Sequence, residues 1–272
     1  MRIWWQDIFT EEVPFTDRSP VLWEGMLRAL LKVRPEGMEL DCGRLDKSSP
    51  LNWYPYLEML NDVYIVKGVM EAAARGYEAA VIGCSCDPAV VEARGMVDIP
   101  VIGLLESSLA VAGMLGRKAA VVTVWDGYVP IIERRIKLYG YGDKVLGQRP
   151  VRHFPLDWGE LIEAFSGRPE ALIQRFEEVA RDCIADGADV VIVGCAYAGP
   201  AFTLAGYNRV TGTEVPVVDC AAAGLQMAAA LVTLEKTCGL KKSRHPFSLY
   251  GRAPRKRAEA ILQEFGLAGF PR

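Results

Sequence analysis

A nine-residue repeat constrains the fold of this chain more strongly than any other feature of its sequence. Residues 76–84 (GYEAAVIGC) align without a gap on residues 187–195 (GADVVIVGC), 111 positions further along. Each copy opens on glycine, which favours the end of a helix, and runs through apolar residues to a Gly-Cys dipeptide. Each copy then reaches a second short apolar run through a proline, Pro100 or Pro216. The repeat predicts two similar halves that contain the same pair of strands.

The rest of the chain alternates short apolar runs with helical patterns. Continuous apolar runs are typical of strands that are buried on both faces of a parallel sheet. Helical patterns, such as residues 64–75 and 172–186, separate these runs, and the alternation predicts βαβ units. We therefore predict an α/β fold of two pseudo-symmetric Rossmann-like lobes with parallel sheets, and the active site in the cleft between them. The expected strands are residues 2–5, 79–83, 101–103, 119–123, 190–194 and 217–218.

The same symmetry predicts how the chain is divided. Lobe 1 is expected to contain residues 1–104 together with residues 218–233, because the chain returns to the first lobe near Val218. Lobe 2 is expected at residues 105–217. Residues 234–272 differ in composition, with three prolines and most of the chain's one basic run. They predict a C-terminal tail that packs on the body or on a partner subunit.

Composition and charge exclude several classes of protein. The chain has 272 residues, of which 51% are hydrophobic and 24% charged, so it is neither disordered nor fibrous. Its net charge of −3 argues against nucleic-acid binding, which needs a basic face. The N-terminus lacks the apolar core of a signal peptide, and Pro216, Asp219 and Gln226 interrupt the best candidate for a membrane span, residues 215–234. We expect a soluble, cytoplasmic protein with a small-molecule substrate and no contact with a membrane.

The seven cysteines predict neither a disulfide framework nor a metal site. Their number is odd and no secretory signal precedes them, which argues against disulfides. Cys84 and Cys86 form a C-x-C pair, but no second Cys or His pair lies at zinc-binding spacing. The chain also lacks the G-x-G-x-x-G and P-loop patterns, so we expect no cofactor.

Cys84 and Cys195, the last residues of the two repeats, are the candidate catalytic pair. Ligands of open α/β sheets bind beyond the carboxyl ends of the strands, where the repeat places both cysteines. A helix that begins after a cysteine lowers the pKa of its thiol and offers N–H groups to a substrate oxygen. Free cysteines are often only buried packing residues, but two at equivalent strand ends favour function. Cysteines without such a counterpart are expected to pack in the core: Cys42, Cys183, Cys220 and Cys238.

Two opposed thiols suit a reaction that is nearly symmetric about one carbon atom. If a pseudo-twofold axis relates the lobes, Cys84 and Cys195 face each other across the cleft. One thiolate then removes a proton from one face of the carbon, and the other thiol returns a proton to the opposite face. This is the chemistry of a racemase or epimerase that needs no cofactor.

Five short segments carry a resemblance to a known family. They are Cys84-x-x-Asp87-Pro88, Val101-Ile102-Gly103-x-x-Glu106, Val121-Val122-Thr123, Gly194-Cys195-Ala196 and Pro216-Val217-Val218-Asp219. Together they resemble the aspartate/glutamate racemase superfamily, and within it the hydantoin and allantoin racemases. The resemblance extends from about residue 60 to residue 233. It implies that Cys84 and Cys195 are the catalytic acid–base pair and that the protein is a homo-oligomer. It also implies a set of substrate-binding groups, namely Thr123 and the main chain at Ser85, Cys86, Ala196 and Tyr197.

The chain departs from that family's pattern at the first strand and beside both cysteines. Hydantoin racemases carry Asn-Pro-Asn-Thr where this chain has Asp7-Ile8-Phe9-Thr10, and we expect Gln6 to supply a substrate-binding amide there. Cys86 and Tyr197 stand where the family usually has glycine, so each narrows the pocket or adds a polar group. Trp53, in a loop, is expected in the core or at a subunit interface rather than at the pocket.

We therefore predict a cofactor-independent racemase or epimerase of the hydantoin-racemase type, acting on a carbon next to a carbonyl. One alternative keeps the fold and changes the reaction. In maleate cis–trans isomerases a cysteine adds to a double bond, and in malonate-type decarboxylases a cysteine protonates a carbanion. A second alternative is a non-catalytic protein that binds a small molecule in the same cleft.

Overall fold

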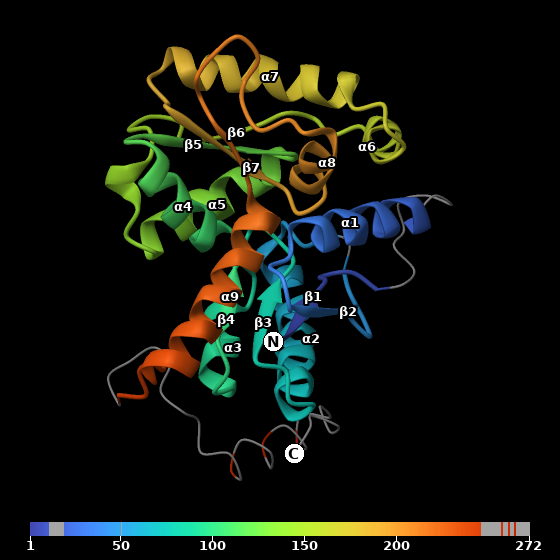
Figure 1. The fold of residues 1–272 in the computed structure, drawn as a ribbon, viewed down its shortest axis with the longest axis vertical. Coiled ribbons are helices and arrows are strands. Elements are labelled where there is room, and N and C mark those ends of the chain that lie inside the picture. The colour runs from blue at the N-terminus through green and yellow to red at the C-terminus, as the bar shows by residue number, and fades with distance from the viewer. Residues whose placement is uncertain (11–18, 50, 246–256, 258–260, 262–263, 265–272) are drawn as a thin grey trace.

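The chain folds into two lobes, each built on a four-stranded parallel sheet (Figure 1). A computed structural model describes residues 1–10, 19–49, 51–245, 257, 261 and 264. The strand order is β2-β1-β3-β4 in the first sheet and β6-β5-β7-β8 in the second, so both halves share one topology. The predicted α/β fold of two similar lobes with parallel sheets is confirmed.

Equivalent elements build the two halves. The first sheet contains β1 (Arg2–Gln6), β2 (Glu39–Gly43), β3 (Ala79–Ile82) and β4 (Val101–Gly103). Its connecting helices are α1 (Ser19–Val33), α2 (Pro55–Ala74) and α3 (Val90–Met96). The second sheet contains β5 (Ala119–Thr123), β6 (Val151–His153), β7 (Val190–Gly194) and β8 (Val217–Asp219). Its helices are α5 (Val129–Leu138), α6 (Trp158–Phe165), α7 (Glu170–Ala185) and α8 (Ala198–Ala205). Two further α-helices, α4 (Leu104–Leu115) and α9 (Cys220–Cys238), follow the last strands of the first and second sheets.

All six predicted strands are present, and within the described residues the sequence pattern missed β2 and β6, each at one edge of its sheet. The central strands β3, β5 and β7 are buried at every position, as their continuous apolar runs indicated. No residue of β2 is buried, and its sequence ELDCG is correspondingly polar, so it lacks the apolar run that marks the other strands of this sheet. The sequence of β6 is VRH, which holds one apolar residue and therefore no continuous apolar run.

Helices α4 and α9 join the two lobes by exchange. α4 follows β4 of the first sheet but packs on β5, β7 and β8 of the second. α9 follows β8 of the second sheet but packs on β3 and β4 of the first, and Figure 1 shows it running along the first lobe. The predicted lobe boundaries, after residue 104 and after residue 217, fall at the junction of β4 with α4 and within β8. The division of the chain between the lobes stays a prediction.

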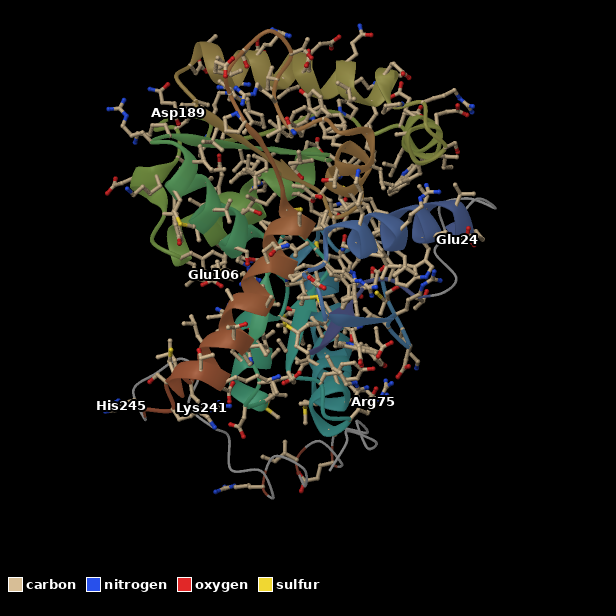
Figure 2. The ribbon with its side chains drawn as sticks, viewed as in Figure 1. Glu24, Arg75, Glu106, Asp189, Lys241 and His245 are labelled. Atoms are coloured by element: carbon tan, nitrogen blue, oxygen red, sulfur yellow. The ribbon has the colours of Figure 1, made fainter. Side chains whose placement is uncertain are left out.

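One hydrophobic cluster runs through both lobes. It contains Trp5 and Met26 from the first half of the chain and Phe154 and Phe176 from the second. Helix α1 contributes to this continuity, since it packs on α6 and α8 of the second lobe. Charged side chains such as Asp189 lie at the outer edge of the molecule (Figure 2).

The C-terminal tail turns back on the first lobe. Helix α9 extends to Cys238, beyond the predicted tail boundary at residue 234. Lys242 Nζ then donates to the carbonyl oxygens of Arg94 and Ile99 at 2.8 and 3.1 Å. Most of the predicted tail beyond residue 245 lies outside the described residues. Within the described parts of the chain, no helix has the length and apolarity needed to cross a membrane.

The α4–α9 contact gives a first prediction. A Cβ at Gly224 of α9 would collide with Leu104 Cδ2 at the start of α4, whereas a Cβ at Gly113 of α4 would meet open space. We expect Gly224→Ala to lower the free energy of unfolding by about 1–3 kcal/mol, since overpacking forces the helices apart. The matched Gly113→Ala should raise it by roughly 0.5–1 kcal/mol through helix propensity alone. Urea unfolding followed by circular dichroism measures both, and equal effects at the two positions would contradict the proposed close contact.

Candidate active site

A cavity of about 310 Å³ lies where the carboxyl ends of the two sheets meet. Loops after β1, β3, β5, β6 and β7 contribute to it, together with the loop before α2. The lining comprises Ile8 and Phe9, Trp53, residues 83–86, Val124, Trp125, Tyr128, Leu156, Trp158 and residues 194–197. Among the described residues, no Asp, Glu, Lys, Arg or His lines this cavity.

Cys84 and Cys195 both line the cavity from equivalent positions, each directly after the glycine that follows or ends its strand. Cys84 Sγ accepts a hydrogen bond from the main-chain N–H of Cys86, and Cys195 Sγ accepts one from the N–H of Ala198, both at 3.4 Å. The structure therefore brings the two repeat cysteines to one cavity and gives each sulfur a main-chain donor.

The chain after the two cysteines differs in local structure. Helix α8 begins at Ala198, so Cys195 stands near a helix start, as the sequence predicted. After Cys84 the helix begins only at Val90. Asp87, with φ of 49°, precedes Pro88, and a residue before proline is disfavoured in the helical region. The first cysteine therefore lies in a turn rather than at a helix start.

Burial controls the protonation of Cys195. It raises the pKa of this thiol to about 11, although hydrogen bonds from the N–H groups of Ala198 and Tyr197 lower it. The sequence predicted that a helix start would lower such a pKa, but in the substrate-free protein the cost of burying a thiolate outweighs that effect. Cys195 is therefore a thiol at neutral pH, which is the state that a proton donor needs.

Cys86 adds a second thiol beside Cys84. Its side chain is buried, and its pKa lies well above the ordinary thiol value, first because of its hydrogen bond with Cys84 and second because of burial. Cys86 lines the cavity, as the sequence predicted for a residue two positions from Cys84. The four cysteines expected to pack in the core do not line it: Cys42, Cys183, Cys220 and Cys238. Cys183 and Cys220 are buried, whereas Cys238 is exposed, so the expectation for Cys238 is wrong.

The residues directly after the two cysteines also line the cavity. Ser85 and Ala196, the residues directly after the two cysteines, are 4% and 5% exposed and line the cavity. Within the described parts of the chain, their N–H groups donate no hydrogen bond. Such N–H groups are free to donate to an oxygen atom within the cavity.

The predicted substrate-binding residues divide into two groups. Ser85, Cys86, Ala196 and Tyr197 line the cavity. Gln6 and Thr123 do not, and their side chains make internal hydrogen bonds. Gln6 Nε2 donates to the Asp7 carbonyl oxygen at 2.9 Å, and its Oε1 accepts from Trp4 Nε1 at 3.0 Å. Thr123 Oγ1 donates to the carbonyl oxygen of Gly194 at 3.0 Å, so it supports the end of β7 from below the cavity.

Asp7 is a buried polar residue beside the cavity that no sequence pattern indicated. Its carboxylate is 1% exposed and accepts the hydroxyl proton of Tyr197 at Oδ2, at 3.0 Å. Its Oδ1 accepts the N–H groups of Ile8 and Phe9 at 2.6 and 3.2 Å. Burial raises the pKa of Asp7 to about 6, although the Tyr197 hydroxyl, these N–H groups and the charge of Arg44 lower it. The position of Asp7 at the end of β1 could have indicated a site residue, but Gln6 lies at the same strand end and was equally favoured.

An aromatic cluster forms one wall of the cavity. The ring centroids of Trp53 and Trp125 are 5.6 Å apart, and those of Trp53 and Tyr128 are 6.3 Å apart. Tyr128 also donates its hydroxyl proton to Asn52 Oδ1 at 2.8 Å. The expectation that Trp53 lies away from the pocket is wrong, because its loop folds over the end of β5. No periodic pattern marks these residues in the sequence.

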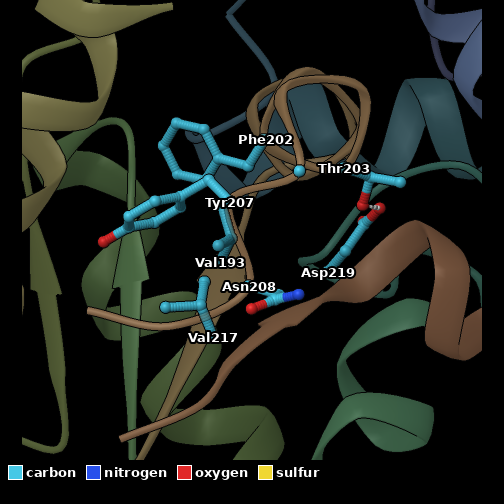
Figure 3. Close-up of a pocket in the computed structure, with 8 residues that line it drawn as sticks. Val193, Phe202, Thr203, Tyr207, Asn208, Val217 and Asp219 are labelled. Atoms are coloured by element: carbon cyan, nitrogen blue, oxygen red, sulfur yellow. Dashed lines mark hydrogen bonds between the residues drawn. The ribbon is translucent and has the colours of Figure 1, made fainter. Parts of the chain in front are cut away.

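A second cavity of about 140 Å³ lies between α8 and the strands β7 and β8 (Figure 3). Asp219 reaches into it, but Thr203 Oγ1 donates to Asp219 Oδ2 at 2.7 Å and the Ala221 N–H donates to Oδ1 at 2.9 Å. Both carboxylate oxygens are therefore occupied in capping α9 and holding α8. This cavity shares no lining residue with the larger one. No group of three or more His, Cys, Asp or Glu in the described chain is arranged to hold a metal ion.

Comparisons with known proteins identify relatives of this chain. A family model described as Asp/Glu/Hydantoin racemase matches residues 22–228. A hydantoin racemase of Pseudomonas sp. (strain NS671) is 30% identical over 213 residues, which cover 78% of each protein. A hydantoin racemase of Rhizobium meliloti is 34% identical over 164 residues, covering 60% of this chain and 64% of that protein.

Solved structures show the same fold. An allantoin racemase from Klebsiella pneumoniae matches with a TM-score of 0.77 at 21% identity, over 99% of this chain and 100% of that one. An allantoin racemase from Pseudomonas fluorescens matches with a TM-score of 0.74 at 24% identity, over 93% of this chain and 97% of that one. At these identities the likeness concerns the fold.

The raised pKa of Asp7 predicts a pH-dependent term in stability. Between about pH 4 and pH 6 the folded protein holds a proton on Asp7 that the unfolded chain has released. The contribution of Asp7 to the free energy of unfolding therefore falls as pH rises through this window, by up to about 3 kcal/mol. Asp7→Asn should remove that fall, so the variant gains stability relative to the wild type between pH 4 and pH 7.

Urea unfolding at several pH values measures this difference. Asp126→Asn is the matched control, since it removes an exposed carboxylate near the same cavity. The raised pKa would be contradicted if the difference in free energy of unfolding between the wild type and Asp7→Asn stayed constant from pH 4 to pH 7.

Proposed function

This chain belongs to the Asp/Glu/hydantoin racemase family and is an isomerase of the racemase type, and from that premise we propose that it is a cofactor-independent racemase or epimerase of the hydantoin-racemase type. It moves a proton between the two faces of a carbon that lies next to a carbonyl group. The observation that carries this proposal is the presence of Cys84 and Cys195 in one cavity, at the ends of equivalent strands.

The proposed reaction uses the two thiols in turn. The Cys84 thiolate removes the proton from one face of the substrate carbon, and the Cys195 thiol donates a proton to the other face. Burial supports the second role, because it keeps Cys195 protonated at neutral pH. In the reverse direction the two residues exchange roles, as a racemase requires.

The N–H groups of Ser85 and Ala196 would stabilise the intermediate. Removal of the proton leaves negative charge on the carbonyl oxygen of the substrate, and donors fixed in a water-poor cavity lower the energy of such an enolate. Ser85 and Ala196 stand one residue after each cysteine, so each thiol has a neighbouring donor in its own half of the cavity.

The cavity lining favours a neutral substrate with an apolar substituent. Side chains of Phe9, Trp53, Trp125 and Trp158 dominate it, and no charged side chain of the described residues lines it. A carboxylate without a paired cation is costly to bury. The lining therefore favours a 5-substituted hydantoin over aspartate, glutamate, or the dicarboxylate substrates of maleate isomerases and malonate-type decarboxylases.

The test is exchange of the α-proton in D2O, followed by proton NMR. We expect exchange on hydantoins with aromatic or branched apolar substituents, and little on allantoin, aspartate, glutamate or maleate. Cys84→Ser and Cys195→Ser should each lower racemisation by about 10²–10⁴-fold, the usual range for loss of an acid–base group. Cys238→Ser, at an exposed cysteine, is the control and should retain activity.

The outcomes separate the alternatives. Conversion of maleate without exchange on any hydantoin would replace the racemase with a cis–trans isomerase. Stabilisation by a ligand with no turnover, and indifference to both serine substitutions, would identify a binding protein.

A further inference from the structure

We propose that two tyrosine–aspartate hydrogen bonds, Tyr197–Asp7 and Tyr139–Asp87, position the two cysteine loops across the cavity. The cysteine loops are defined as residues 84–87 and 195–197. This inference rests on the proposed two-thiol reaction and adds positioning residues to it, one pair for each thiol.

The first bond joins the Cys195 loop to the first lobe. Tyr197, two residues after Cys195, donates its hydroxyl proton to Asp7 Oδ2 at 3.0 Å. Asp7 follows β1 of the first sheet, and main-chain N–H groups fix its other oxygen. Ala198, the residue directly after Tyr197, donates its N–H to the sulfur of Cys195 at 3.4 Å. A side chain anchored on the opposite lobe therefore holds the backbone that contacts the thiol.

The second bond is its counterpart at the other cysteine. Tyr139, directly after α5 of the second lobe, donates its hydroxyl proton to Asp87 Oδ2 at 3.0 Å. Asp87 lies three residues after Cys84, and its N–H donates to the Cys84 carbonyl oxygen at 3.1 Å. Asp87 also accepts the N–H of Leu105 at 2.9 Å, at the start of α4. This loop supplies the aspartate, whereas the Cys195 loop supplies the tyrosine.

Both bonds lie where water does not replace them easily. Asp7 and Asp87 are 1% and 0% exposed. Loss of the Tyr197 hydroxyl therefore takes the donor from a buried carboxylate oxygen, Asp7 Oδ2. Asp87 Oδ2 would keep the Glu106 N–H, at 3.0 Å, and lose only its bond to the opposite lobe. Proton transfer requires the sulfur and the substrate carbon to be about 3–3.5 Å apart. A cysteine loop that drifts from the opposite lobe loses that approach, while the rest of the cavity keeps its shape.

The alternative is that these bonds only stabilise the fold. Tyr207 provides the comparison, because its hydroxyl also donates to a carboxylate, Glu177 Oε1 at 3.1 Å, and it does not line the main cavity. Tyr197→Phe, Tyr139→Phe and Tyr207→Phe therefore each remove one hydroxyl from one tyrosine–carboxylate bond. Only the first two act on a cysteine loop.

The first measurement does not depend on activity. Alkylation of the substrate-free protein by iodoacetamide, followed by peptide mass spectrometry, gives a rate for each cysteine. We expect Tyr197→Phe to accelerate alkylation of Cys195 by about tenfold, the factor that one hydrogen bond to a charged group represents, and to leave Cys84 unchanged. Tyr139→Phe should accelerate Cys84 and leave Cys195 unchanged. Tyr207→Phe should change neither.

The second measurement uses the reaction itself. Tyr197→Phe and Tyr139→Phe should each lower kcat and leave KM for the substrate nearly unchanged. Substrate binding depends on the shape of the cavity, whereas proton transfer depends on the position of the thiol. In D2O, deuterium enters both the recovered starting enantiomer and the inverted product, and the ratio of the two is measured for each enantiomer as substrate. Tyr197→Phe should change this ratio for one enantiomer, and Tyr139→Phe should change it for the other. Asp7→Asn keeps a hydrogen-bond acceptor for the Tyr197 hydroxyl and should therefore leave the alkylation rate of Cys195 near the wild-type value. This measurement does not require Tyr197→Phe to fold.

The results distinguish this inference from the proposed function. Equal changes at both cysteines, or the same changes in Tyr207→Phe, would overturn the positioning role. Loop-specific alkylation in a protein that exchanges no substrate would support the positioning role and reject the racemase.

Discussion

The exchange of α4 and α9 between the lobes is the contact on which the rest of the structure depends. Each helix leaves the sheet that it follows and packs on the other sheet, so each sheet is covered in part by a helix from the other half of the chain. The hydrophobic cluster that results is continuous between the lobes. It fixes the carboxyl ends of both sheets against one cavity, and the catalytic candidates are the residues at those ends.

Burial in an apolar cavity then determines the chemistry that the site can perform. It raises the pKa of Cys195, which lines the cavity, to about 11. Burial also raises the pKa of Asp7 and Asp87, which do not line the cavity, to about 6. The same low polarity strengthens a hydrogen bond from a fixed N–H group to a developing enolate oxygen. A neutral substrate that becomes charged only during the reaction suits such a site better than a substrate that arrives with its own charges.

The sequence predicted the parts of this arrangement that repeat locally. One repeated apolar pattern predicted β3 and β7 and the cysteine after each strand. The same repeat predicted that both cysteines lie at the carboxyl ends of their sheets. Side-chain direction was harder to predict at the end of β1, because successive residues of a strand point to opposite faces. The Gln6 side chain faces Gly68 on α2, whereas Asp7, the next residue, contacts Tyr197. The prediction therefore chose a residue one position before the one that contacts the cavity lining. The edge strands and the aromatic wall depend on tertiary contacts that no local pattern records.

Two departures from the family pattern turn out to be one structural feature. The sequence has Asp7 where the resemblance leads one to expect an Asn-Pro-Asn-Thr stretch, and it has Tyr197 where glycine is usual. These positions are 190 residues apart in the chain, yet their side chains share a hydrogen bond of 3.0 Å. A tyrosine buried in place of glycine needs an acceptor for its hydroxyl, and a buried aspartate needs a donor. Each residue therefore meets the requirement that the other creates. Tyr197 lines the cavity beside Cys195, and its bond to Asp7 connects this part of the lining to the opposite lobe.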